Sequence, residues 1–191
     1  MFEQLLESIA RGLERLGIPY MLIGGQAVLL YGEPRLTRDI DVTLGVGPER
    51  LTQLLGWVCE SGWQVLVEAP AEFVRKTMVL PCLEPASGIR VDFIFSFSAY
   101  EQQALKRVRR VLVGGVEVCF VSLEDLLIHK VLAGRPRDLE DVHSILLKNP
   151  TFDLDYVRRW LREFDRSLGG KSLERFDEVR ESPRRPQRSN Y

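Results

Sequence analysis

The chain has 191 residues, enough for one domain with a substantial core and a small helical addition. Apolar residues make up 45% of it and charged residues 28%, an ordinary balance for a globular protein. The formal net charge of -1 excludes a global attraction to nucleic acid or to an anionic membrane, so any polyanion must be held by a local patch.

The first part of the sequence predicts alternating helices and short strands. Apolar residues at helical spacing predict a helix over residues 2–16. The apolar run at 20–23 predicts a buried strand, and Gly24 and Gly25 break it before a brief helix. Apolar and polar residues then alternate over 39–44, which is typical of a strand with one buried face.

The middle of the chain predicts one helix and several further strands. A helix is expected over 48–62, with proline near its start and glycine at its end. Strand-like segments are expected at 63–67 and 73–80, and residues 89–95 alternate between apolar and polar side chains. Two short apolar runs around a glycine pair predict a hairpin over 111–121.

From Ser122 onward the apolar residues follow helical spacing. Ser122 and Asp125 have the spacing of a helix capping box. Helices are expected near 122–133, 137–148 and 153–168. The sequence therefore predicts an α+β fold in three parts: a core over 1–121, a helical region packed on it over 122–170, and a basic, proline-containing tail over 171–191 that is largely disordered.

Three aspartates are the candidate metal ligands. Asp39 and Asp41 share the polar side of one expected strand, where their like charges repel unless a divalent cation binds them. Asp92, on the polar side of another strand, can supply a third carboxylate and allow two magnesium ions to bind. An Asp-x-Asp pattern is also compatible with a solvated strand end, or with the single metal site of a nucleotide-sugar transferase.

Gly24 and Gly25 stand at a strand-to-helix junction, where backbone N–H groups can approach an anion. Combined with the aspartates downstream, this pattern is more specific than either feature alone. Residues 23–27 (Ile-Gly-Gly-Gln-Ala) and 37–41 (Thr-Arg-Asp-Ile-Asp) resemble the signature of the DNA polymerase β-like nucleotidyltransferase superfamily. The third metal-ligand strand of that superfamily and the later motifs of its AbiEii-type toxin branch resemble residues 91–93, 124–130 and 135–142.

This resemblance implies a nucleotidyltransferase-like mixed β-sheet core with flanking helices. The implied reaction is transfer of a nucleoside monophosphate from an NTP to a hydroxyl, with pyrophosphate leaving. Gly24 and Gly25 would hold the triphosphate, and Asp39 and Asp41 would bind two Mg²⁺ or Mn²⁺ ions. Asp92 would bind the metal that activates the acceptor.

Several further residues complete the expected site. Lys130 and Asp138 match further motif positions of the branch. Lys130 also lies on the inward apolar stripe of its helix, where a lysine needs an anionic partner or a path to water, and the resemblance favours a phosphate. Arg38 and Arg135 are expected to help bind the triphosphate. Gln26 departs from the family, because Thr or Ser often follows the glycines there.

We therefore expect a magnesium-dependent nucleotidyltransferase whose acceptor is an RNA end, a protein or a small molecule. The resemblance adds an expected role as the toxin of a toxin–antitoxin or abortive-infection system, with a cognate partner protein. The alternative is a nucleotide-binding or antitoxin-like protein of the same fold that lacks turnover. A cytoplasmic location without a membrane partner is expected, because no secretory signal and no apolar run of ~20 residues is present.

Overall fold

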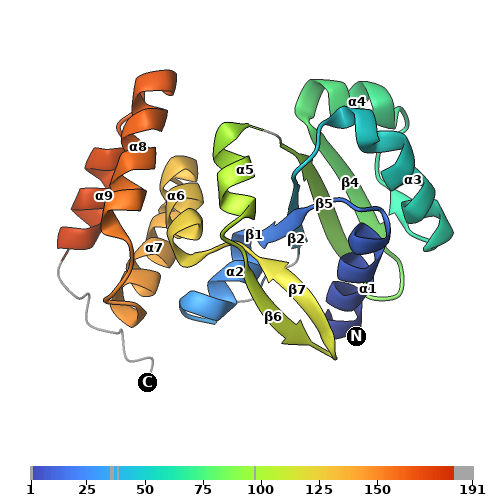
Figure 1. Cartoon of the computed structure of the whole chain (residues 1–191), viewed down its shortest axis with the longest axis horizontal. Coiled ribbons are helices and arrows are strands. Elements are labelled where there is room, and N and C mark those ends of the chain that lie inside the picture. Colours follow the sequence, from blue (N-terminus) through green and yellow to red (C-terminus); the bar gives the residue numbers. More distant parts are fainter. Residues whose placement is uncertain (1, 35–36, 38, 97, 183–191) are drawn as a thin grey trace.

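A mixed sheet of seven strands forms the centre of the molecule, within the residues that the structure describes: 2–34, 37, 39–96 and 98–182. In this computed structural model the strands are β1 (Tyr20–Ile23), β2 (Asp39–Leu44), β3 (Gln64–Val65), β4 (Val79–Glu84), β5 (Ile89–Phe95), β6 (Arg109–Val113) and β7 (Val116–Phe120). Their order is β3-β4-β5-β2-β1-β7-β6. β2 pairs in parallel with β5 and β1 with β7, whereas the other neighbours are antiparallel (Figure 1).

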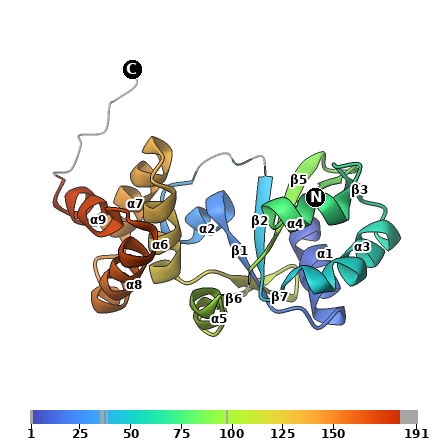
Figure 2. The same cartoon turned by 90° about the horizontal axis from the view of Figure 1, so that it is seen from above.

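Helices surround this sheet and also form a separate group at one end. They are α1 (Phe2–Arg15), α2 (Gly24–Tyr31), α3 (Leu51–Glu60), α4 (Pro70–Thr77), α5 (Ala99–Leu105), α6 (Leu123–Ala133), α7 (Pro136–Lys148), α8 (Leu154–Leu168) and α9 (Ser172–Glu181). Figure 2 shows α6 to α9 together at one end, with α1, α3 and α4 at the other. None of the described helices is long and apolar enough to cross a membrane.

Most elements predicted from periodicity are confirmed, including the α+β architecture. The helix expected over 2–16 is α1, and the strands expected at 20–23 and 39–44 are β1 and β2. The expected hairpin over 111–121 is formed by β6 and β7. Ser122 caps α6 as predicted, because its Oγ accepts a hydrogen bond from the backbone N–H of Asp125 at 3.1 Å.

The strand expected at 73–80 is wrong over most of its length. Residues up to Thr77 belong to α4, which starts at Pro70, and the strand β4 begins only at Val79. Proline is favourable in the first turn of a helix, and Met78 ends α4 in a left-handed conformation with φ of 60°. The short apolar run Met78–Leu80 therefore reflects a helix end followed by a strand start.

The tail expected to be largely disordered from residue 171 is also wrong for its first part. Residues 172–181 form α9, and Phe176 in that helix is fully buried. Arg175 of α9 donates a hydrogen bond to the carbonyl of Val131 on α6 at 2.8 Å. One buried aromatic ring and this contact attach α9 to the bundle, whereas the sequence of α9 is mostly charged and shows only a weak apolar stripe. Residues 183–191 of the expected tail lie outside the described part of the chain.

β2 and β5, which are neighbours in the sheet, each have one apolar side and one polar side. On β5, Val91, Phe93 and Phe95 are buried, and the ring of Phe93 packs against Trp57 of α3 and the nearby Trp63. The alternate residues of the strand face the other side of the sheet. The core thus fixes which side chains β5 presents on the opposite face, and that face carries Asp92.

Candidate active site

The three predicted carboxylates come together on the centre of the sheet. β2 and β5 pair in parallel, and their register sets Asp41 opposite Asp92 and Asp39 opposite Arg90. Alternate residues of a strand point to the same face, so these four side chains project from one side of the sheet. The expectation that a neighbouring strand brings Asp92 to Asp39 and Asp41 matches this register.

Gly24 begins α2 directly beside these carboxylates. β1 lies next to β2 and pairs Ile23 with Asp41. The first turn of α2 therefore starts at the end of the acidic face, the side of the sheet that carries Asp39, Asp41 and Asp92. Gly24 has a φ of 67°, a left-handed conformation that favours glycine. A Cβ atom at this position would collide with Oδ2 of Asp41. Glycine is therefore required here both by the backbone and by the close carboxylate.

Asp41 lies in an unfavourable electrostatic environment. Burial, followed by the negative charges of Asp39 and Asp92, raises the pKa of Asp41 to about 6. The positive charges of Lys130 and Arg135 act in the opposite direction but do not cancel this effect. The acidic face thus carries more negative charge than its own surroundings neutralise, which suits a site that binds cations.

Asp92 has a partner of its own on the same strand. Nε of Arg90 lies 2.8 Å from Oδ1 of Asp92, in an ion pair whose arginine side chain is 53% exposed and whose aspartate is 17% exposed. Within the described residues, no group of three or more His, Cys, Asp or Glu side chains is placed to hold one metal ion. The carboxylates fit magnesium in chemistry and in position along the strands, but Asp92 is engaged by Arg90.

Gln26 holds the start of β2 against α2. Its side chain is buried, and its Nε2 donates hydrogen bonds to Oγ1 of Thr37 and, at 3.5 Å, to the backbone carbonyl of Asp39. The residue that departs from the family pattern is therefore in contact with the segment leading to the first carboxylate. Its contacts support the position of Asp39 rather than requiring a phosphate.

Lys130 is buried in a cluster of charges between α6 and α7. Its Nζ lies 2.8 Å from Oδ1 of Asp138 and 2.8 Å from Oδ2 of Asp141, and only 6% of its side chain is exposed. The sequence left a snorkelling lysine and a phosphate contact as alternatives. The structure instead provides two carboxylates from α7, so that Lys130 is satisfied within the protein.

Arg135 extends this cluster toward solvent. It precedes Pro136 at the start of α7, and its Nε lies 2.6 Å from Oδ2 of Asp138. Burial alone would raise the pKa of Asp138, but hydrogen bonds from Arg135 and Lys130 outweigh it, and that pKa is lowered. The side chain of Arg135 remains 76% exposed, so Asp138 orients a guanidinium that still reaches solvent.

A cavity of about 570 Å³ unites the acidic face and the charged cluster. Its lining includes the expected site residues Gly24, Gly25, Asp39, Asp41, Asp92, Lys130, Arg135 and Asp138. Arg38, also expected in the site, lies outside the described residues. Thr37 and Arg137 line the cavity too, and the sequence analysis missed both. Thr37 stands within the first motif and Arg137 within the later segment 135–142, so their positions in these motifs were the available signal.

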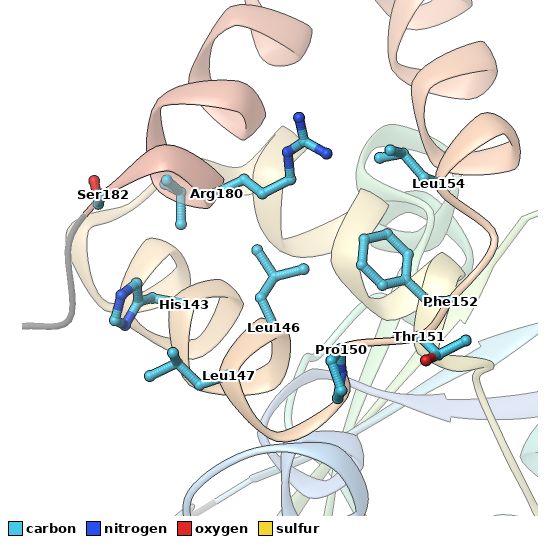
Figure 3. Close-up of a pocket in the computed structure, with 10 residues that line it drawn as sticks. His143, Leu146, Leu147, Pro150, Thr151, Phe152, Leu154, Arg180 and Ser182 are labelled. Atoms are coloured by element: carbon cyan, nitrogen blue, oxygen red, sulfur yellow. The ribbon is translucent and has the colours of Figure 1, made fainter.

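A second cavity of about 420 Å³ lies at the other end of α7 (Figure 3). Leu146, Leu147, Phe152, Leu154 and Val179 make most of its lining apolar. Its residues include no acidic side chain, so it lacks the carboxylates and the charge pattern of the first cavity. The chemistry of the molecule is therefore concentrated at the sheet.

The mixed sheet, with its paired carboxylates beside a Gly-Gly helix start, agrees with the nucleotidyltransferase-like fold that the sequence motifs predicted. Residues 1–179 match the family described as nucleotidyltransferase of unknown function (DUF6036), and the chain belongs to that family. No curated protein matches the sequence.

Two solved structures are similar to this chain over most of their length. One is an antigenic nucleotidyltransferase-like protein from Paracoccidioides brasiliensis, with a TM-score of 0.56, 18% identity, and coverage of 90% of this chain and 91% of that one. The other is ANT(2'')-Ia in complex with adenylyl-2''-tobramycin, with a TM-score of 0.59, 18% identity, and coverage of 88% and 98%. At this identity the likeness establishes the nucleotidyltransferase-like fold.

Proposed function

We propose that this nucleotidyltransferase transfers a nucleoside monophosphate from an NTP to a hydroxyl group in a magnesium-dependent reaction. The observation that carries the proposal is the cavity in which Asp39, Asp41 and Asp92 face the Gly24-Gly25 helix start. Magnesium binds hard oxygen ligands and is completed by substrate phosphates, so this combination of groups suits an NTP with its metal ions.

The groups that line the cavity form two sets with different proposed functions. Asp39, Asp41 and Asp92 would hold the metal ions, whose positive charge would stabilise the transferring phosphoryl group and favour ionisation of the attacking hydroxyl. The backbone N–H groups of Gly24 and Gly25, at the start of α2, are suited to the triphosphate.

On the opposite wall, the charged cluster would orient the phosphates. Arg135 presents an exposed guanidinium there, and Asp138 fixes its direction. Lys130 would act on the phosphates through Asp138, as a positioning residue, because its ion pairs are with the carboxylates of Asp138 and Asp141. Arg38 belongs to the proposal from its position before Asp39 in the motif.

The proposed reaction is a single displacement at the α-phosphorus. The acceptor oxygen forms a bond to the α-phosphorus, the bond to the bridging oxygen of the β-phosphate breaks, and pyrophosphate leaves with that electron pair. The proton of the hydroxyl passes to Asp92 or to solvent. Catalysis would come mainly from positioning and charge stabilisation, as is general for phosphoryl transfer.

The test is transfer of label from α-³²P NTPs in the presence of magnesium and a panel of hydroxyl acceptors. The panel should hold RNA with a free 3′ end, protein extracts and small molecules, with tobramycin included because a structure of similar fold contains its adenylylated form. We expect Asp41→Asn to reduce transfer by about a hundred- to a thousandfold, as for loss of central electrostatic stabilisation. Equal transfer by wild type and Asp41→Asn would contradict the proposed site.

A nucleotide-binding protein without turnover is the second candidate, and Gln26 is the observation that favours it, because it replaces a residue that is often Thr or Ser in related proteins. Its side chain donates hydrogen bonds to Thr37 and to the backbone carbonyl of Asp39 instead of facing outward. Magnesium-dependent NTP binding by wild type without any transferred label would favour this candidate, and transfer gained in Gln26→Thr would identify Gln26 as the cause. Transfer by wild type itself would favour the enzyme.

The biological role is proposed from the resemblance to the AbiEii-type branch. Lys130 and Asp138, the residues that match its later motifs, are in direct contact at 2.8 Å, as expected if the motif acts as a unit. We propose a toxin that a partner protein neutralises. Induced expression should arrest bacterial growth for wild type and not for Asp41→Asn. If cells that express wild-type protein grow normally although that protein transfers label in vitro, the toxin role is contradicted and the transfer activity is not.

A further inference from the structure

Arg90 is the charged residue on the acidic face that the proposed reaction does not use. It stands two residues before Asp92 on β5, so both side chains leave the strand on the same face. Across the parallel pair it lies opposite Asp39. On the other side β4 contributes Leu83 opposite Arg90 and Pro81 opposite Asp92, neither of which carries charge. The guanidinium is therefore placed next to carboxylates on two of its sides.

The contact of Arg90 engages one of the two carboxylate oxygens of Asp92. Its Nε lies 2.8 Å from Oδ1 of Asp92, close enough for a charge-assisted hydrogen bond. β5 is an inner strand paired on both sides, so its backbone cannot shift to separate the two residues. With this ion pair closed, the described residues contain no group of three or more His, Cys, Asp or Glu side chains placed to hold one metal ion.

We propose that Arg90 is an internal counter-ion that competes with divalent metal for Asp92 and so sets the metal concentration at which the site fills. The inference rests on the proposed metal site. The exposed guanidinium can swing into solvent when the metal takes its place, since 53% of its side chain is accessible. Arg90 is thus a positioning residue for the third carboxylate, acting before any substrate is present.

The experiment is titration of the full chain with Mn²⁺ alone, without nucleotide, reading the free ion by electron paramagnetic resonance. Arg90→Gln removes the charge and keeps a polar side chain. We expect it to bind Mn²⁺ about fivefold more tightly than wild type, the size of a partly exposed ion pair. The matched control is Arg110→Gln, which removes an arginine paired with Glu117 at 3.1 Å on the β6–β7 hairpin, and it should bind Mn²⁺ like wild type.

Two further variants locate the effect. In an Asp92→Asn background, Arg90→Gln should give no gain in affinity, because the carboxylate for which they compete is gone. If Arg90→Gln binds Mn²⁺ no more tightly than wild type, while Asp41→Asn still loses Mn²⁺ binding, the inference about Arg90 is overturned. If Asp41→Asn binds Mn²⁺ like wild type, the metal site itself is wrong, and the inference about Arg90 falls with it.

Discussion

The acidic face of the sheet and the charged cluster between α6 and α7 contain the same kinds of side chain in opposite balance. On the sheet, crowding and burial raise the pKa of Asp41 to about 6. In the cluster, Lys130 and Arg135 contact Asp138 directly, and its pKa is lowered. Both groups line one cavity.

The difference separates a binding surface from a structural support. Buried charges that are matched within the protein hold helices in place, whereas buried charges left unmatched stabilise the fold only when a ligand of opposite sign arrives. Asp41, the carboxylate whose charge is least matched, lies on an inner strand of the sheet. We infer that the charged cluster between α6 and α7 orients side chains, whereas the carboxylates on the sheet favour the binding of a cation.

The largest expected effect comes from breaking the matched cluster. Lys130→Met leaves Asp138 and Asp141 buried with fewer cations, and it should lower the free energy of unfolding by about 3–5 kcal/mol. Urea denaturation measures this change. Lys76→Met, which removes an exposed lysine paired with Glu72, serves as the control and should cost no more than about 0.5 kcal/mol. Equal losses in the two variants would remove the distinction between the regions.

Charge removal from the two regions should change stability in opposite directions. The folded protein binds the Asp41 proton more tightly than the unfolded chain does, so stability is lost as pH rises through about 6. In EDTA at pH 8, Asp41→Asn should therefore stabilise the protein by up to about 3 kcal/mol, and the gain should vanish near pH 4. Asp138→Asn should destabilise it at pH 8. Denaturation curves at both pH values measure these changes in the free energy of unfolding. If Asp41→Asn and Asp138→Asn shift stability in the same direction at pH 8, the comparison between the two regions is contradicted.

An intermediate effect is expected where α2 meets the acidic face. Gly24→Ala imposes a left-handed alanine and pushes a Cβ into Asp41, which should cost about 2–3 kcal/mol. Gly17 has a similar φ of 62° but nothing within 4 Å of an added Cβ, so Gly17→Ala isolates the backbone cost of about 1–2 kcal/mol. Thermal unfolding of both variants measures the difference. Identical losses would mean that the carboxylate moves aside without cost.

The smallest change in stability is expected at Arg135, although its effect on substrate should be clear. Arg135→Ala removes a side chain that is 76% exposed and should alter the free energy of unfolding by less than about 1 kcal/mol. Under the proposed function it should raise the KM for NTP. Arg166→Ala is a matched control, since that side chain is also 76% exposed and pairs with an acid three residues away. A KM unchanged relative to this control would place Arg135 outside the phosphate site.

Periodicity predicted the parts of the fold that have one apolar face. The alternation of apolar and polar residues over 39–42 and 89–93 placed Asp41 and Asp92 on the polar side of strands. The segment 73–80 and α9 were not predictable in this way, because a short helix end and a mostly charged helix carry little pattern.

The candidate site was predictable where the residues form a local motif. The Gly-Gly turn and the Asp-Ile-Asp strand are such motifs, and they line the cavity. The ion pairs of Lys130 depend on how α6 packs against α7, and the contact of Arg90 depends on strand register and side-chain rotation. Such pairings are properties of the packed molecule, so spacing along the chain could not reveal them.

The parallel pairing of β2 with β5 also has a consequence for how the protein folds. Parallel neighbours need a long crossover, and here the intervening chain includes α3, α4, β3 and β4. Asp41 and Asp92 therefore meet only after this whole segment has been made and packed, and their mutual repulsion opposes that step. Under the proposed function, magnesium present during folding would reduce this repulsion and favour the pairing of the two strands.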